Sequence, residues 1–260
     1  MMRSTMKDKF HKGILKFLPI VFWLLIWQLV SNILHNEIIL VSPIRVINTL
    51  FLLCGTGLFW TSILSSLIRI IGGFFLGLFV GIVLAVCSHQ ILFLKLLLKP
   101  ITGIVKTTPV ASFVILALIW IGSKNLAVFI SFLMVFPVIY TNVLKGIENV
   151  NQEMLEMAQI FSMSWIKRYL YLYIPEVMPY FLSASSLSLG LCWKAGIAAE
   201  VIGLPISSIG EQLYQAKLYL STEKLFAWTL VIIILSVTIE KLFMAFISAC
   251  YKMLGGVHIS

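Results

Sequence analysis

Residues 60–87 read W-T-S-I-L-S-S-L-I-R-I-I-G-G-F-F-L-G-L-F-V-G-I-V-L-A-V-C, an apolar run interrupted by a single charge, Arg69. An α-helix rises about 1.5 Å per residue, so about 20 apolar residues cross the hydrocarbon core of a bilayer. Lipid offers no partners for backbone hydrogen bonds, whereas a helix satisfies them internally. We therefore interpret this stretch as a membrane-spanning helix.

The composition of the whole chain is that of a membrane protein. Its 260 residues are 60% hydrophobic and 11% charged, with a mean hydropathy of +1.05, whereas a soluble domain carries about 25% charged residues. This excludes most soluble enzymes and a disordered chain. The net charge of +9 indicates basic cytoplasmic loops rather than nucleic-acid binding, because no basic stripe is interleaved with aromatic residues.

Six apolar stretches are long enough to cross the membrane, and the fold class predicted is an all-α polytopic membrane protein with six transmembrane helices. The third stretch contains Lys106, Thr107, Thr108 and Pro109, so we expect a kink or break there. Most lysines and arginines between the spans fall on the side of the N-terminus, which places both termini in the cytoplasm. The stretches run at about 17–34, 60–87, 92–121, 125–145, 176–198 and 225–250.

The chain is expected to comprise a basic cytoplasmic N-terminus (1–16), a membrane domain (17–250) that includes a cytoplasmic loop (148–175), and a cytoplasmic tail (251–260). Residues 1–16 resemble the start of a signal peptide. However, the apolar run that follows is as long as a full span and is not followed by a small-residue cleavage site. We interpret it as an uncleaved first helix.

Gly73, Gly77, Gly81 and Ala85 recur every four residues in the second span. This spacing puts small residues on one helical face, where a second helix can approach closely. We expect a packing face. The four cysteines and four histidines are scattered, without a C-x-x-C pair, and indicate neither a disulfide framework nor a metal site.

The loop 148–175 is the one long polar stretch on the predicted cytoplasmic side and reads E-N-V-N-Q-E-M-L-E-M-A-Q-I-F-S-M-S-W-I-K-R-Y-L-Y-L-Y-I-P. Its apolar residues have three- and four-residue spacing, which predicts two short helices joined by a turn near Ser162. Exposed apolar residues there favour docking to another protein. The aromatic residues that follow equally favour a helix lying on lipid headgroups. The periodicity leaves both interpretations open.

The spacing in this loop resembles a known motif. Glu156-Met157-Ala158, three residues, Ser162, nine residues and Leu172-Tyr173-Ile174-Pro175 are similar to the coupling motif of ABC importer permeases, which is E-A-A, three residues, G, nine residues and I-x-L-P. The sequence departs from it at Met157, where the family prefers Ala, and at Ser162, where it prefers Gly.

The resemblance covers roughly residues 17–250. Four further segments occur in the same order as in the nitrate, sulfonate and taurine subgroup of these permeases. They are Val41-Ser42-Pro43-Ile44-Arg45-Val46, Ser66-Leu67-Ile68-Arg69-Ile70-Ile71-Gly72-Gly73-Phe74, Thr108-Pro109-Val110-Ala111 and Ala198-Ala199-Glu200-Val201-Ile202-Gly203.

The resemblance implies a type I ABC importer permease fold in the cell membrane. It also implies three partners: a second permease copy that forms a homodimer with this one, cytosolic ABC ATPase subunits and an extracytoplasmic substrate-binding protein. It implies a non-catalytic chain that binds no cofactor, with ATP and Mg on the partner ATPase; the chain has no G-x-x-x-x-G-K-[ST] phosphate loop. The ATPase would dock on Glu153, Met154, Leu155, Glu156, Met157, Ala158, Phe161, Ser162, Trp165 and Pro175.

Residues at the predicted break of the third span, and in or just after the fifth span, are candidates for the substrate path. They are Lys106, Thr107, Thr108, Pro109, Ser186, Trp193, Lys194 and Glu200. For the serine-rich fifth span, ordinary helix packing is an equally good interpretation. Lys194 and Glu200 could pair near the outer side, and Arg69 is better explained by a structural role at the headgroups.

Cations near the path suit a small anion such as nitrate, a sulfonate or taurine. The alternative cargo is a pyrimidine vitamin precursor, which related permeases carry. A secondary transporter is a weaker alternative, because no inverted repeat is found and Glu176 and Glu240 lie toward the ends of their predicted spans. An intramembrane enzyme would need a Ser/His pair or an H-E-x-x-H motif, and the sequence shows neither.

Overall fold

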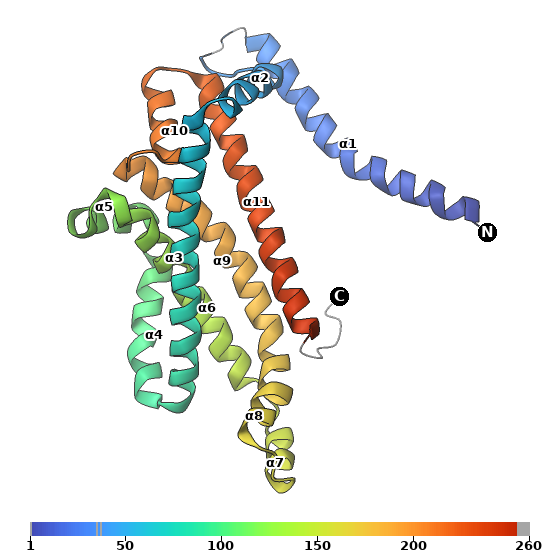
Figure 1. Cartoon of the computed structure of the whole chain (residues 1–260), viewed down its shortest axis with the longest axis vertical. Coiled ribbons are helices and arrows are strands. Elements are labelled where there is room, and N and C mark those ends of the chain that lie inside the picture. Colours follow the sequence, from blue (N-terminus) through green and yellow to red (C-terminus); the bar gives the residue numbers. More distant parts are fainter. Residues whose placement is uncertain (1, 35, 37, 254–260) are drawn as a thin grey trace. The chain divides into compact units, whose positions relative to one another are not determined.

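The computed structural model describes residues 2–34, 36 and 38–253, with side chains from residue 18 onward, and the described residues are helical throughout apart from short connections (Figure 1). The side chains of the predicted basic N-terminus and residues 254–260 of the predicted tail lie outside that description. The helices are α1 (Met2–Leu34), α2 (Pro43–Cys54), α3 (Gly57–Gln90), α4 (Leu92–Thr107), α5 (Val110–Ile121), α6 (Ser123–Glu148), α7 (Gln152–Ile160), α8 (Trp165–Arg168), the π-helix η1 (Tyr169–Tyr173), α9 (Ile174–Gly203), α10 (Ile209–Leu218) and α11 (Thr222–Met253).

Within the described part of the chain, four helical stretches are long and apolar enough to cross a membrane. A fifth is obtained if the bent pair α4 and α5 counts as one span. The first predicted span falls in α1, whose apolar part, Leu18–Leu34, is shorter. The four are Gly57–Gln90, Ser123–Glu148, Trp165–Gly203 and Thr222–Lys252.

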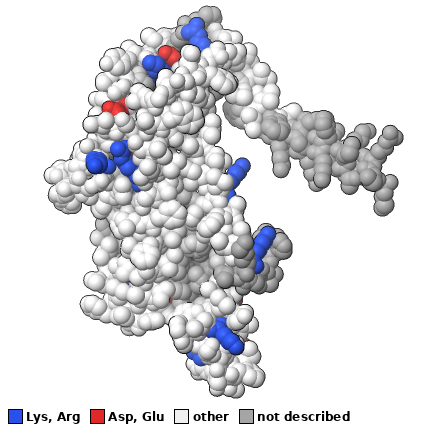
Figure 2. All heavy atoms as spheres, viewed as in Figure 1, with Lys and Arg blue, Asp and Glu red and all other residues white. Residues whose placement is uncertain are grey.

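The break predicted in the third span is confirmed. The axes of α4 and α5 differ by 109°, because Thr108 leaves the helix with ψ of 134° and Pro109 follows it. A residue before proline is driven to extended backbone, and proline donates no backbone hydrogen bond. The surface agrees with a lipid environment: on the face drawn in Figure 2, charged side chains are few.

Contacts divide the chain into two compact units, residues 1–60 with 213–231 and residues 61–212 with 232–260. In the first unit, Val41, Val46 and Ala227 form a small core. Trp27 donates from Nε1 to the carbonyl of Val41 at 3.0 Å, and Thr222 donates from its hydroxyl to the carbonyl of Ile38 at 2.8 Å. These bonds hold the segment between α1 and α2 to the start of α11.

The core of the second unit is formed by α5, α6 and α9. Leu126 and Ile130 of α6 are fully buried and cluster with Ala195 and Ala199 of α9 and Val114 of α5. Because the alanine side chains of α9 are small, the larger side chains of α6 fill the space between the two helices.

The glycines of α3 lie against α6 without room for a side chain. A Cβ at Gly77 would stand 2.8 Å from the Cβ of Val135 and 3.0 Å from the carbonyl oxygen of Phe132. A Cβ at Gly81 would stand 2.9 Å from Cγ2 of Ile139, and one at Gly73 would meet the backbone of Val128. The face predicted from the four-residue spacing is therefore in backbone contact with α6.

Replacing Gly77 with leucine should destabilise the protein by about 1–3 kcal/mol, because the added atoms overlap with α6. Gly72→Leu is the matched control, since a Cβ at that position meets nothing within 4 Å. The measurement is the midpoint of thermal unfolding of the purified protein. Equal unfolding midpoints for Gly77→Leu and Gly72→Leu would show that the close approach of α3 and α6 does not stabilise the protein.

Candidate functional site: the loop 148–175 and the helix α9

The predicted coupling loop is a helix that ends in a closed turn. Asn151 caps α7 by accepting from the backbone N–H of Glu153 at 2.8 Å. At the other end, the N–H of Met163 donates to the carbonyl of Ala158 and the N–H of Ser162 to that of Gln159, each at 2.9 Å. This pair of bonds is the Schellman arrangement that terminates helices. The turn predicted near Ser162 is confirmed.

Ser162 occupies the left-handed position of this turn, with φ of 47°. Glycine adopts that conformation freely, whereas a residue with a Cβ is strained in it. This is the position at which the permease motif prefers glycine. The backbone conformation at Ser162 is thus one that glycine would adopt with less strain.

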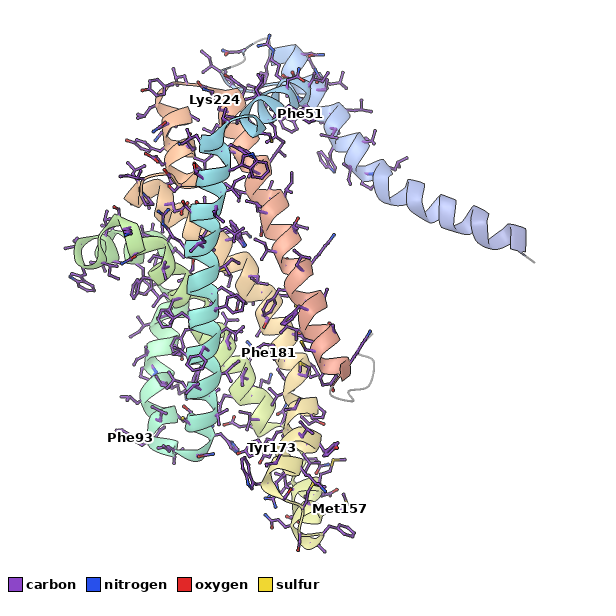
Figure 3. All side chains as sticks on the ribbon, in the orientation of Figure 1. Phe51, Phe93, Met157, Tyr173, Phe181 and Lys224 are labelled. Atoms are coloured by element: carbon purple, nitrogen blue, oxygen red, sulfur yellow. The ribbon has the colours of Figure 1, made fainter. Side chains whose placement is uncertain are left out.

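The tip of the loop exposes a set of large apolar side chains. Ala158 is buried beneath them at 2% exposure, while Glu153 and Glu156 are exposed and Leu155 is half-buried. Met157 lies at the tip of the loop, and Tyr173 and then Phe181 lie farther from the tip (Figure 3). Ile160, which sequence reasoning missed, is the most exposed of the set. The exposed apolar residues are Met154, Met157, Ile160, Phe161 and Trp165, at 50–80%.

The helix that contains Pro175 begins earlier in the chain than Pro175 itself. Pro175 does lie in the first turn of α9, where proline is tolerated. However, α8, η1 and α9 follow one another without a break, so Trp165–Gly203 forms one helical stretch. The non-helical part of the loop therefore ends at Ser164, and the segment after it is already joined to the span.

The candidates at the α4–α5 break satisfy their polar groups within α4 and α6. Lys106 donates from Nζ to the hydroxyl of Thr141 at 2.9 Å. Thr108 donates from its hydroxyl to the carbonyl of Ile104 at 2.8 Å, and Thr107 donates to that of Gly103 at 3.1 Å. Pro109 is the N-cap residue of α5. Lys106 is exposed, and the carbonyl of Ile104 also accepts from the backbone N–H of Thr108 at 3.0 Å.

The candidates on α9 lie on different faces. Lys194 is exposed and shares its face with Ser183, Leu187 and Ala198, spaced as helix neighbours. Ser186 is half-buried. Trp193 is buried at 1% exposure, so it does not belong to that face. Because α9 extends to Gly203, Lys194 stands nine residues, or about 14 Å, inside the end of the helix.

Glu200 is fully buried and does not pair with Lys194 as the sequence suggested. It accepts from the hydroxyl of Ser66 at 2.6 Å and from Arg69 at 3.4 Å. The backbone N–H of Gly210 also donates to it, at 3.3 Å. Arg69 further donates to the carbonyl of Ile206 at 3.3 Å, which agrees with a structural role. This network ties α3, the end of α9 and the start of α10 together.

Glu240 was predicted to lie toward the end of its span, and the structure places it elsewhere. It lies thirteen residues before the end of α11 and accepts from the hydroxyl of Ser186 at 2.5 Å. The sequence feature that could have predicted this contact is an acidic residue in the span that follows the serine-rich one. Glu200 and Glu240 show that intramembrane carboxylates are held by serines of neighbouring helices.

An all-helical membrane protein with an exposed apolar loop joined directly to a polar spanning helix has the features of an importer permease. The chain belongs to the family of binding-protein-dependent transport system inner membrane components, which its residues 73–249 match. It is therefore a non-catalytic ABC transporter permease of the membrane. This membership decides against the secondary-transporter and enzyme alternatives.

Relatives with known descriptions carry several small anionic or zwitterionic substrates. The chain is 27% identical over 219 residues to a Bacillus subtilis protein provisionally named an aliphatic sulfonates transport permease, covering 83% of this chain and 78% of that one. It is 24% identical to the taurine transport permease of Escherichia coli, covering 84% and 81%. It is 28% identical to the nitrate import permease of Leptolyngbya laminosa, covering 56% and 52%.

A solved structure supports the fold. A chain from the crystal structure of an amino acid ABC transporter with histidines superposes with a TM-score of 0.59 at 19% identity, over 73% of this chain and 92% of that one. Together with the family match, this similarity assigns the type I ABC importer permease fold.

Replacing Glu200 with alanine should destabilise the protein by about 3–5 kcal/mol, because it leaves a partly buried arginine unpaired and strands the buried donors of Ser66 and Gly210. The readout is again the thermal unfolding midpoint. Glu176→Ala, at an exposed position in the first turn of α9, is the control and should change the midpoint little. Similar midpoints for both variants would contradict the assigned network.

Proposed function

We propose that this chain is the membrane-spanning subunit of an ATP-driven importer for a small anion of the nitrate, sulfonate or taurine type. The observation that carries the proposal is the apolar tip of residues 154–165, most of it on α7, which a closed turn joins to the helical stretch that ends in α9. Family membership implies the partners, a cytosolic ATPase and a substrate-binding protein. The chain would form a homodimer, each copy docking one ATPase.

The proposed topology has six spans with both termini in the cytoplasm. Four long helices, the bent pair α4 and α5, and the apolar part of α1 would supply them. Residues 1–16 and 251–260 would then be cytoplasmic, and 17–250 would form the membrane domain with the loop 148–175 on the same side as the termini. The positive-inside bias of the sequence supports this orientation.

Docking on the loop tip explains why its apolar residues are exposed. Large apolar side chains at 50–80% exposure, rimmed by Glu153 and Glu156, are typical of a protein interface. The closed turn at Ser162 fixes their geometry. Because α8, η1 and α9 are continuous, a displacement of the tip by the ATPase would be transmitted along the helix axis to the span.

Lys194 supports an anionic substrate. A lysine on the exposed face of a spanning helix, about 14 Å from its end, would be unfavourable in lipid. That face also carries Ser183 and Ala198 and is adjacent to Gly190, where a Cβ would meet nothing within 4 Å. We place this face, with Ser186 beside it, along the substrate path. Lys106, Thr107, Thr108 and Pro109 would line it from the α4–α5 break, and the roles of Trp193 and Glu200 in the path stay predictions.

Phe161→Ala should weaken binding of the ATPase by about tenfold or more, because interface energy concentrates in large, central apolar side chains. Binding of the purified ATPase to the reconstituted permease measures it. Phe79→Ala, which removes the same ring from an exposed position on α3, should leave binding unchanged. An equal effect of the two variants would exclude the tip as the docking surface.

Lys194→Gln should lower ATP-dependent uptake of the anion by about tenfold or more, since a single charge contact within the membrane is worth a few kcal/mol. Uptake of labelled nitrate, taurine and bicarbonate into vesicles, with the ATPase and binding protein present, measures it. Lys124→Gln, at an exposed position in α6, is the control. Uptake of a neutral pyrimidine precursor in place of these anions would overturn the proposed substrate class.

A further inference from the structure

An apolar cavity of about 310 Å³ lies where the coupling loop joins the spans. Its walls come from α3, α6, η1 and α9, which are all in the second compact unit. Apart from one histidine and the tyrosine hydroxyls, the lining is hydrocarbon or aromatic. Representative lining residues are Val86, His89, Ile147, Tyr169, Tyr173 and Phe181.

The cavity begins at the ends of the helices and extends into the spans. His89 is the residue before the last one of α3, whereas Ile82, also in the lining, lies eight residues before the end, about 12 Å deeper. Phe181 is seven residues into α9, about 10 Å from its start. In a bilayer whose surface lies at these helix ends, a slot of this depth would start at headgroup level and end among acyl chains.

The aromatic wall is ordered by ring contacts. Tyr169 and Tyr173 stack with centroids 5.0 Å apart, and His89 meets Tyr173 edge-on at 6.3 Å. Both tyrosines belong to the π-helix η1, a form of helix that is frequent at functional sites. Their hydroxyl-bearing rings suit the boundary between headgroups and hydrocarbon.

The helix ends around the cavity carry an excess of positive charge. Lys167 and Arg168 directly precede the lining residue Tyr169, and Nε of Arg168 is buried without a hydrogen-bond partner among the described residues. Lys145 lies over the ring of Tyr180 at 5.9 Å. Of the nearby acids, Glu148 is paired with Lys95 at 2.5 Å, and Glu176 is exposed in the first turn of α9. The surface in Figure 2 shows Lys and Arg at the end that α7 and α8 occupy in Figure 1.

We propose that this cavity binds one acyl chain of an anionic phospholipid, whose phosphate is held by Lys167 and Arg168. An apolar slot at acyl depth next to basic groups at headgroup depth matches the two halves of such a lipid. Water filling the slot would find few hydrogen-bond partners. The bound lipid would contact η1 and the spans α3 and α6 together, at the base of the segment that carries the docking tip.

The test uses the full chain, purified with its ATPase and exchanged into bilayer discs of phosphatidylcholine with added phosphatidylglycerol. Native mass spectrometry then measures which lipid each permease chain retains. Two independent variants are compared: Val177→Phe, which fills the cavity from α9, and the double variant Lys167→Gln with Arg168→Gln, which leaves the packing intact. The matched controls are Leu97→Phe, on an exposed part of α4, and Lys124→Gln.

The wild-type chain and the controls should retain phosphatidylglycerol in preference to phosphatidylcholine. Each site variant should lower the retention of phosphatidylglycerol by about tenfold or more. Val177→Phe fills the space for the acyl chain. The double variant removes two basic residues, each of which contributes about 1 kcal/mol to binding anionic lipid near the surface. Unchanged retention in both variants, or equal retention of the two lipids by the wild type, would overturn the proposal. A change in permease pairing caused by Val177→Phe, with retention unchanged, would assign the cavity to a second copy instead. Lipid retention is independent of ATPase docking, so failure of the function proposed above would leave this result readable.

Discussion

The close approach of α3, α6 and α9 is the constraint on which the second unit depends. Glycines of α3 contact the backbone of α6, and a Cβ at Gly196 of α9 would stand 2.7 Å from Ile70 and 2.8 Å from the hydroxyl of Ser131. In lipid, no hydrophobic effect drives helices together, so dispersion between closely approaching backbones must do so. The buried serines and the Glu200 network are then placed on helices whose separation is already fixed.

This packing bears on the proposed coupling between the loop and the span. Most tip residues lie on α7, and backbone hydrogen bonds close the turn at Ser162. After that turn, α8, η1 and α9 continue as one helical stretch. A rigid helix passes an axial displacement on, whereas a flexible linker would absorb it. The core between α6 and α9 gives that helix a surface to move against, and the apolar cavity lies beside the junction.

Spacing predicted two local features, the turn near Ser162 and the packing face of the four-residue glycine repeat. The docking role of the loop came from its resemblance to a known motif and stays a prediction. Ile160 was missed because periodicity shows that a residue is apolar but not that it is uncovered. Glu200 was paired with Lys194 because only residues close in sequence could be compared, whereas its partners Ser66 and Arg69 lie 134 and 131 positions away.

The sequence by itself determined that the chain is a membrane protein, where its long apolar helices run, where the third predicted span breaks and which loop resembles a coupling motif. These properties follow from hydropathy, helical period and proline chemistry, which are local. Only the tertiary structure decided which carboxylates are paired, which face of α9 exposes Lys194 and that η1 closes a cavity. Those depend on which helices are neighbours and how they are rotated, and that is set by side-chain packing between residues far apart in the chain.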